Sequence, residues 1–215
     1  MKTQVDFRSY IEAGSKAYTD GQYTEGGKIF LNALKEAKRV RLQDSRLTVI
    51  LYNLAHFYFQ QKRYRKAEAL LERALGHCEG LFGRNCDHVS RILNRIADVH
   101  MIEQRYSRAE ALYKRSLQID RRLLPADDPQ VAKQLLKLAW LNCIQNNFDE
   151  AHENLKEALE IKVQNVRAQK KFAKPPAVEQ NIVDDLGDDE FNDPLEDDVQ
   201  SGDLAFPSSS FTLVN

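Results

Sequence analysis

Two cysteines and two histidines lie close together in the segment from Gly76 to His88. Thiolates and imidazoles in that number form a valid ligand set for zinc. The spacing of Cys78 and Cys86, however, matches no familiar zinc module, and the repeat described below places the segment at the end of a helix. We therefore interpret these residues as ordinary helix-end and loop residues, and we expect no bound metal.

No other spacing in the chain suggests catalysis. The sequence contains no Ser-His-Asp arrangement, no Gly-rich phosphate loop and no isolated carboxylate pair. Its many glutamates fall where a solvent-exposed helix face explains them. The sequence therefore predicts a protein without enzymatic activity and without a cofactor.

A second set of residues has the composition of a binding surface. Two segments that lie 42 residues apart each carry two bases at an i, i+4 spacing, which places both bases on one face of a helix. A tryptophan lies one turn beyond the second pair, and an asparagine occupies the matching place in an earlier segment. These candidate residues are Asn53, Arg91, Arg95, Lys133, Lys137 and Trp140. Such a surface suits an acidic protein segment, and the alternative is that the bases only form a solvated face.

These candidates are positioned by an internal repeat. The block Ala67–Leu75 recurs as Ala109–Leu117 and as Ala151–Leu159, at steps of 42 residues. A weaker copy, Gly26–Leu34, lies 41 residues before the first of these blocks. A period of this size is typical of proteins built from stacked repeats.

A second amphipathic segment precedes each block. In the second unit, Leu51, Leu54, Ala55 and Tyr58 have the i, i+3, i+4, i+7 spacing of one helix face. Each unit is thus a helix, a turn and a second helix, and units must stack because neither helix can bury its apolar face alone. The sequence predicts an all-α, right-handed α-solenoid of four hairpins, in units of about 4–42, 45–84, 87–126 and 129–172. We expect the following residues to be buried: Leu54, Ala55, Ala67, Leu71, Ile96, Ala97, Ala109, Leu138, Ala139 and Ala151.

The pattern resembles the tetratricopeptide repeat, whose signature runs W-x2-L-G-x2-Y…A-x3-F. The resemblance covers about four-fifths of the chain, and the 42-residue period is longer than the usual 34. The segment Tyr113–Leu135, with its lengthened second helix, is similar to the kinesin-light-chain subtype. The heptad segment through which a kinesin light chain joins its motor is missing here. The resemblance therefore implies the module of a cargo adaptor or scaffold, and not the motor function.

The resemblance also implies where a partner would bind. In this family the first helices of the units line an inner, concave surface that holds peptides. Asn53 matches an asparagine that holds a peptide backbone, and Arg91 and Arg95 fall where the carboxylate-clamp subgroup carries basic residues. Ile11 and Ser15 stand in the first unit where that clamp has Lys and Asn. The resemblance thus implies a basic concave groove that departs from the clamp pattern in the first unit.

The charge of the chain is divided between two segments. All 31 Lys and Arg lie at or before Lys174, whereas eleven of the 32 acids lie in 175–215, so 1–174 carries +10 and 175–215 carries −11. We expect 1–174 to form the repeat domain and 175–215 to be a disordered acidic tail. The tail is expected to compete for the basic groove, with Phe191 and Leu195 as apolar anchors. The alternative is a tail that only keeps the protein soluble.

The composition indicates a cytoplasmic protein. The sequence has no apolar run of membrane-spanning length, no secretory signal and only three cysteines. We therefore expect an adaptor or scaffold that binds another protein through a peptide segment. A regulatory subunit of a larger complex or enzyme is the alternative, and nucleic-acid binding is less favoured because aromatic residues are not interleaved with the bases.

Overall fold

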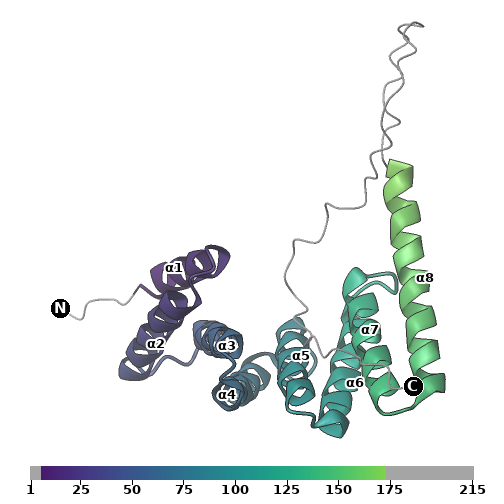
Figure 1. The fold of residues 1–215 in the computed structure, drawn as a ribbon. Coiled ribbons are helices and arrows are strands. Elements are labelled where there is room, and N and C mark those ends of the chain that lie inside the picture. Colours follow the sequence, from purple (N-terminus) through teal and green to yellow (C-terminus); the bar gives the residue numbers. More distant parts are fainter. Residues whose placement is uncertain (1–5, 173–215) are drawn as a thin grey trace, which may run out of the picture. The chain divides into compact units, whose positions relative to one another are not determined.

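The computed structural model describes residues 6–172 of the chain, with side chains described up to residue 167. These residues form helices only (Figure 1). The helices are α1 (Phe7–Thr19), α2 (Tyr23–Arg39), α3 (Ser45–Gln60), α4 (Tyr64–Phe82), α5 (Asp87–Ile102), α6 (Tyr106–Leu123), α7 (Pro129–Ile144) and α8 (Phe148–Phe172). The expected acidic tail, 175–215, lies outside the described residues.

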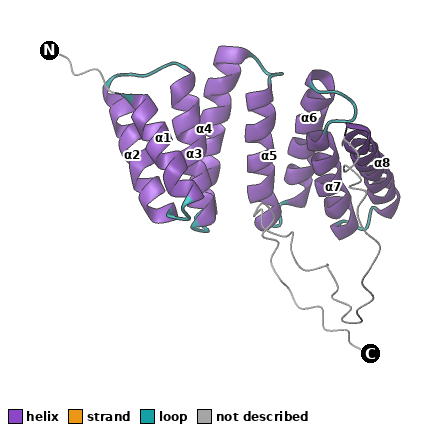
Figure 2. Ribbon diagram, turned by 90° about the horizontal axis from the view of Figure 1, so that it is seen from above, coloured by secondary structure: helices purple, strands orange, loops and turns teal. Residues whose placement is uncertain are grey.

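Consecutive helices pair into four hairpins, α1 with α2, α3 with α4, α5 with α6 and α7 with α8. Each hairpin then packs on the next, because α2 contacts α3, α4 contacts α5 and α6 contacts α7. The views in Figures 1 and 2 show the hairpins in this order from one end of the row to the other. The predicted all-α solenoid of four hairpins is confirmed. Among the described residues, no helix combines the length and the apolar character that crossing a membrane requires.

The turn inside each hairpin has the same backbone geometry in all four units. One residue of each turn has a φ between 58° and 69°, in the left-handed region that ends a helix. These residues are Gly21, Lys62, Gln104 and Asn146. The following N–H then bonds back to a carbonyl of the preceding helix, as from Asn147 to Asn142 at 2.8 Å. Only the first unit uses glycine, although the conformation is strained for other residues.

An aspartate begins three of the four first helices. The Asp6, Asp44 and Asp128 carboxylates each accept a hydrogen bond from a backbone N–H of the first turn of α1, α3 and α7. Pro129 follows Asp128 at the first helical position, where its missing N–H is not needed. The predicted roles of Asp128 as N-cap and of Pro129 in the first turn of α7 are therefore confirmed.

The core follows the predicted apolar faces. All ten residues expected to be buried are at most 6% exposed. Small residues allow helices to approach closely, and at Gly14 an added Cβ would lie 2.1 Å from the Phe30 ring. Buried apolar residues form two clusters, one centred on the first two hairpins and one on the last two.

Candidate functional site

The six predicted binding residues lie on the first helices of three consecutive hairpins. Asn53 is on α3, Arg91 and Arg95 are on α5, and the other three are on α7. We call this set, with the side chains that hold it, the first-helix face. In Figure 1, α1, α3 and α7 lie on one side of the row, with α2, α4 and α6 on the other. The structure thus places the predicted residues on neighbouring units, one hairpin apart.

Asp98 connects the bases of α5 to those of α7. Its Oδ1 lies 2.6 Å from the Lys137 Nζ and accepts a 2.5 Å hydrogen bond from the Tyr113 hydroxyl. Its Oδ2 lies 3.7 Å from an Arg95 guanidinium nitrogen. Lys137 and Arg95 are only 16% and 23% exposed, so much of their charge is directed at this carboxylate. The two bases are therefore held in fixed positions between adjacent hairpins.

Aromatic rings complete the cluster around Asp98. The Lys137 Nζ lies 5.3 Å from the centre of the Tyr113 ring, and the Arg95 guanidinium lies 5.8 Å from the centre of the Phe59 ring. Both distances are within the range of cation–π attraction. Burial, together with the nearby Asp98 carboxylate, holds the pKa of the Tyr113 phenol far above its usual value. The phenol therefore stays protonated and acts as a hydrogen-bond donor.

The remaining predicted residues are more open to solvent. Arg91 is paired within α5, with 3.0 Å between its Nε and the Asp87 carboxylate, yet its side chain is 60% exposed. Lys133 is exposed, and the Trp140 side chain is 40% exposed. The Asn53 amide donates a 2.9 Å hydrogen bond to the Val49 carbonyl of its own helix. Arg91, Lys133 and Trp140 are thus exposed to solvent on this face.

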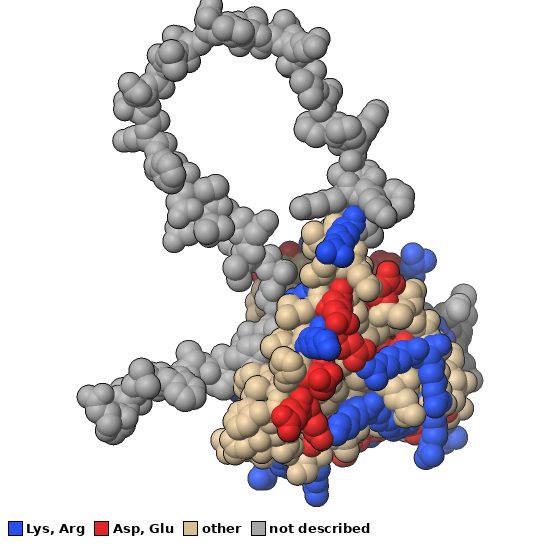
Figure 3. All heavy atoms as spheres, turned by 90° about the vertical axis from the view of Figure 1, so that its right-hand side faces the viewer, with Lys and Arg blue, Asp and Glu red and all other residues tan. Residues whose placement is uncertain are grey.

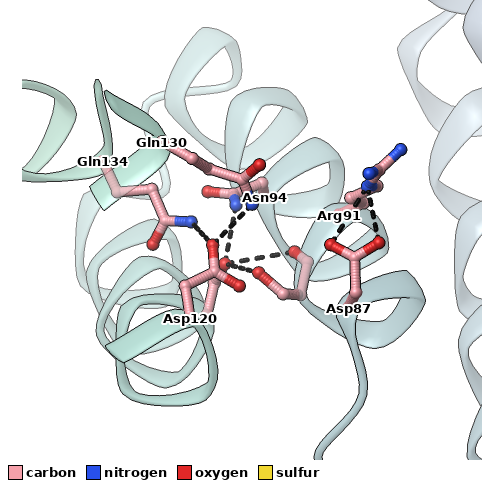
Figure 4. A network of polar contacts seen from close by, with 8 residues as sticks. Asp87, Arg91, Asn94, Asp120, Gln130 and Gln134 are labelled. Carbon is pink, nitrogen blue, oxygen red and sulfur yellow. Dashed lines mark hydrogen bonds and ion pairs between the residues drawn. The ribbon is translucent and has the colours of Figure 1, made fainter. Parts of the chain in front are cut away.

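A buried polar network lies beneath this face, between α5, α6 and α7 (Figure 4). The Asp120 carboxylate is 1% exposed and accepts hydrogen bonds from the side-chain amides of Gln130, at 2.7 Å, and Gln134. One helical turn earlier on α6, the Ser116 hydroxyl accepts a 2.6 Å hydrogen bond from the Asn94 amide. Because buried polar groups need matched partners, these bonds specify how the three helices meet.

The Gly76–His88 segment shows no metal-binding arrangement. Cys78 is fully buried, and burial followed by the neighbouring Cys86 raises the pKa of its thiol to about 12. Within residues 6–172, no three or more His, Cys, Asp and Glu side chains gather in a way that could hold an ion. The absence of a bound metal itself remains a prediction.

Asp98 and Tyr113, like Phe59, belong to the cluster but were not among the predicted site residues. Asp98 falls on the same helical face as Arg91 and Arg95, and its opposite charge was the available signal. Tyr113 stands in the repeat where Leu71 and Leu155 stand in the neighbouring units, so its hydroxyl was visible as a departure from the apolar pattern. Their contact with Lys137 crosses from one hairpin to the next, which no spacing along the chain reveals.

Comparisons with known proteins agree with this architecture. The family model of the tetratricopeptide repeat matches residues 46–98 and 88–162, which together are more than half of the chain. No curated protein matches the chain by sequence.

Solved structures share the fold at low sequence identity. BtubC (BKLC) from P. vanneervenii is 19% identical, with a TM-score of 0.71 over 86% of this chain and 74% of that chain. A putative kinesin light chain from Podosopora anserina, with nearly identical TPR-like repeats, is 18% identical, with a TM-score of 0.59 over 78% of this chain and 77% of that chain. A Rap protein complexed with competence and sporulation factor is 17% identical, with a TM-score of 0.61 over 74% of this chain and 45% of that chain. The fold is thus similar to that of kinesin-light-chain-like structures, and the chain belongs to the tetratricopeptide repeat family.

Proposed function

We propose that the first-helix face binds an acidic segment of another protein and that the chain acts as an adaptor or scaffold without catalysis. The observation that carries this proposal is the arrangement of Arg91, Lys133 and Trp140 around the Asp98 cluster. Exposed bases attract carboxylates, and an exposed indole supplies an apolar contact of the kind that dominates many interfaces. The fold supports a binding role, since one structural neighbour is a Rap protein in complex with competence and sporulation factor.

The Asp98 cluster divides the four bases of this face into two roles. Lys137 and Arg95 are turned toward an internal carboxylate, so they hold the face in shape and supply only part of their charge to a partner. Arg91 and Lys133 are the bases that a partner carboxylate would meet first. Each exposed ion pair contributes about 0.2–1 kcal/mol, so we expect Trp140 to contribute more than either base.

Charge reversal of the exposed bases tests the proposal. Trp140 is the only tryptophan, so its fluorescence reports on this face in the full chain. A library of acidic peptides with single apolar anchors is titrated against the wild type and against the Arg91→Glu, Lys133→Glu double variant. We expect at least one peptide to shift the emission and to bind the double variant about tenfold more weakly, as a loss of two such contacts allows.

A matched control separates this site from general charge. Lys28 is 66% exposed on α2, outside the first-helix face, and Lys28→Glu should leave peptide binding unchanged. If peptides bind the wild type and the double variant equally, the bases are solvated surface and the proposal is wrong. Binding of nucleic acid that does not depend on base sequence and weakens steeply with salt would instead support the nucleic-acid alternative.

We further propose, from sequence charge alone, that the acidic segment 175–215 competes for this face. From the composition of the sequence we also propose that the protein acts in the cytoplasm. A covalently linked segment has an effective concentration on the order of millimolar, which occupies even a weak site. In the full chain, neutralising the acids of 175–215 to Asn and Gln should change Trp140 emission at low salt and strengthen peptide binding. Unchanged emission and unchanged affinity would show that the segment does not compete.

A further inference from the structure

The last helix, α8, carries an apolar stripe that the described part of the chain leaves uncovered. Leu155, Leu159, Val163 and Val166 are 43–52% exposed, and Phe148 at the start of the helix is 63% exposed. At about 100° per residue these side chains fall within about 80° of one another around the helix. The adjoining side of α8, centred roughly 110° away around the helix, packs on the hairpin core through Ala151, Ala158 and Ile161, which are at most 5% exposed.

The repeat shows that this stripe corresponds to a surface that is covered elsewhere. Leu71 on α4 and Tyr113 on α6 occupy the same repeat position as Leu155, and they are 0% and 2% exposed. Leu117 is 6% exposed, whereas its counterpart Leu159 is 52% exposed. In the earlier units the next hairpin covers these positions, since α4 packs on α5 and α6 packs on α7. The stripe on α8 is therefore built like an interface.

The stripe forms a shallow groove with charged edges. The groove has a volume of about 450 Å³, and Lys156, Glu160 and Arg167 line it beside the leucines. Figure 3 shows the face on which α8 lies, where acidic residues form an oblique stripe and basic residues lie at its upper end and beside it. Along α8, the acids Asp149, Glu150 and Glu153 precede the bases Lys162 and Arg167.

The order of charges along α8 indicates which kind of helix could bind in the groove. Asp149 and Arg167 lie the same number of residues on either side of Ala158, and so do Lys156 and Glu160. All four are exposed on the same edge of the stripe. In an antiparallel pair of α8 helices related by a two-fold axis near Ala158, each base of one copy would face an acid of the other. In a parallel two-fold pair the same edges would lie on opposite sides of the interface, so these four residues would not meet.

We propose that α8 is a self-association surface on which the protein forms a two-fold symmetric dimer, with the α8 helices of two copies antiparallel. Leu155, Leu159 and Val163 of each copy would interleave at the centre, and the Asp149–Arg167 and Lys156–Glu160 contacts would fix the direction. Such an interface is self-complementary, as two-fold dimers require. One helix from each copy buries a small area, so we expect a dissociation constant on the order of micromolar.

Substitution of the central leucine is the first test. Sedimentation and light scattering of the full chain should give about twice the 24.8 kDa monomer mass at concentrations on the order of 100 µM. Leu159→Glu should weaken the dimer at least tenfold, because the two-fold axis places both introduced carboxylates in the apolar centre. The matched control is Leu81→Glu on α4, where the leucine is 43% exposed and lies on another helix. It should dimerise like the wild type.

A charge swap tests the antiparallel direction. Asp149→Arg and Arg167→Asp should each weaken the dimer by about threefold to tenfold, since each disrupts two symmetric contacts. The double variant should dimerise again with itself. It should pair poorly with differently tagged wild-type chain, because Arg would then face Arg and Asp would face Asp.

Three results would overturn the proposal. A chain that stays monomeric at these concentrations does not self-associate through α8. If the protein is monomeric and Leu159→Glu lowers its unfolding midpoint, the stripe packs against another part of the same chain. Equal pairing of the double variant with itself and with the wild type would exclude the antiparallel arrangement. None of these outcomes depends on whether the first-helix face binds a peptide.

Discussion

The two halves of the repeat domain are held together by different chemistry. In the first two hairpins the core is largely aromatic and aliphatic, with Phe30 and Phe57 rings 5.7 Å apart at its centre. In the last two hairpins several buried side chains are polar. These are Ser90, His100, Ser116, Asp120, Gln134 and Asn142, all at most 6% exposed.

This difference shows in which half the helices are held most precisely relative to one another. An apolar core gains free energy roughly in proportion to buried area and tolerates small shifts of one helix on another. A buried hydrogen-bond network does not tolerate such shifts, because a shifted donor loses its acceptor and stays desolvated. The polar half carries the Asp98 cluster and most of the predicted binding residues. The two helices that present most of the first-helix face, α5 and α7, are therefore held by directional bonds through α6.

The largest effect should follow from opening the apolar half. Phe57 is 2% exposed and packs so closely on Gly26 that an added Cβ there would lie 2.3 Å from its ring. Phe57→Ala should lower the free energy of unfolding by about 3–5 kcal/mol, measured by urea denaturation. Phe82→Ala is the control, since Phe82 is 47% exposed and should cost far less. Equal losses at both positions would show that the aromatic cluster is not the stabilising element.

A smaller but more specific loss is expected in the polar half. Asp120→Ala removes the acceptor of the Gln130 and Gln134 amides and leaves buried donors without a partner. We expect a loss of about 1–3 kcal/mol in the free energy of unfolding. The exposed Asp127→Ala is the control. If Asp120→Ala is neutral, the network does not hold α6 to α7, and the contrast between the halves weakens.

The polar half should also respond to pH through His100. Burial, followed by the positive charge of Arg105, lowers the pKa of the His100 imidazole, while Glu68 acts in the opposite direction. The unfolded chain then binds a proton at a higher pH than the folded chain does, so stability is lost as pH falls below about 6.5 toward the folded pKa. Urea midpoints at pH 7.5 and 5.5 should differ less in His100→Leu than in the wild type. An identical pH dependence in the two proteins would contradict this prediction.

The smallest effect should be the same in both halves. Lys62 and Gln104 occupy the left-handed turn position that Gly21 occupies in the first unit. Replacing either residue with glycine relieves backbone strain and should raise the free energy of unfolding by up to about 1 kcal/mol, measured by thermal or urea denaturation. Gly21→Ala should have the opposite sign. A gain at Lys62 without a gain at Gln104 would mean that the turns, like the cores, differ between the halves.

The repeat and its helices could be predicted because the apolar spacing of each helix is visible within its own unit. The i, i+3, i+4, i+7 spacing of residues such as Leu51, Leu54 and Ala55 places them on one face, and a recurrence at 42 residues sets the hairpin boundaries. Small residues at the same repeat position, Gly14, Ala55, Ala97 and Ala139, likewise indicated close helix packing, and all four are buried. These features depend on local periodicity, which sequence alone contains.

The sequence by itself thus determined the fold class, the core faces and which helices carry the candidate bases. Only the tertiary structure decided what those bases meet. Lys137 and Asp98 lie 39 residues apart in sequence, and their 2.6 Å contact exists because stacking brings α7 beside α5. The exposure of Leu155, against the burial of Tyr113 at the same repeat position, likewise follows from packing, since among residues 6–172 a further hairpin packs on α6 but not on α8. Periodicity fixes the direction of a side chain on its own helix, whereas its partners depend on how the helices pack together.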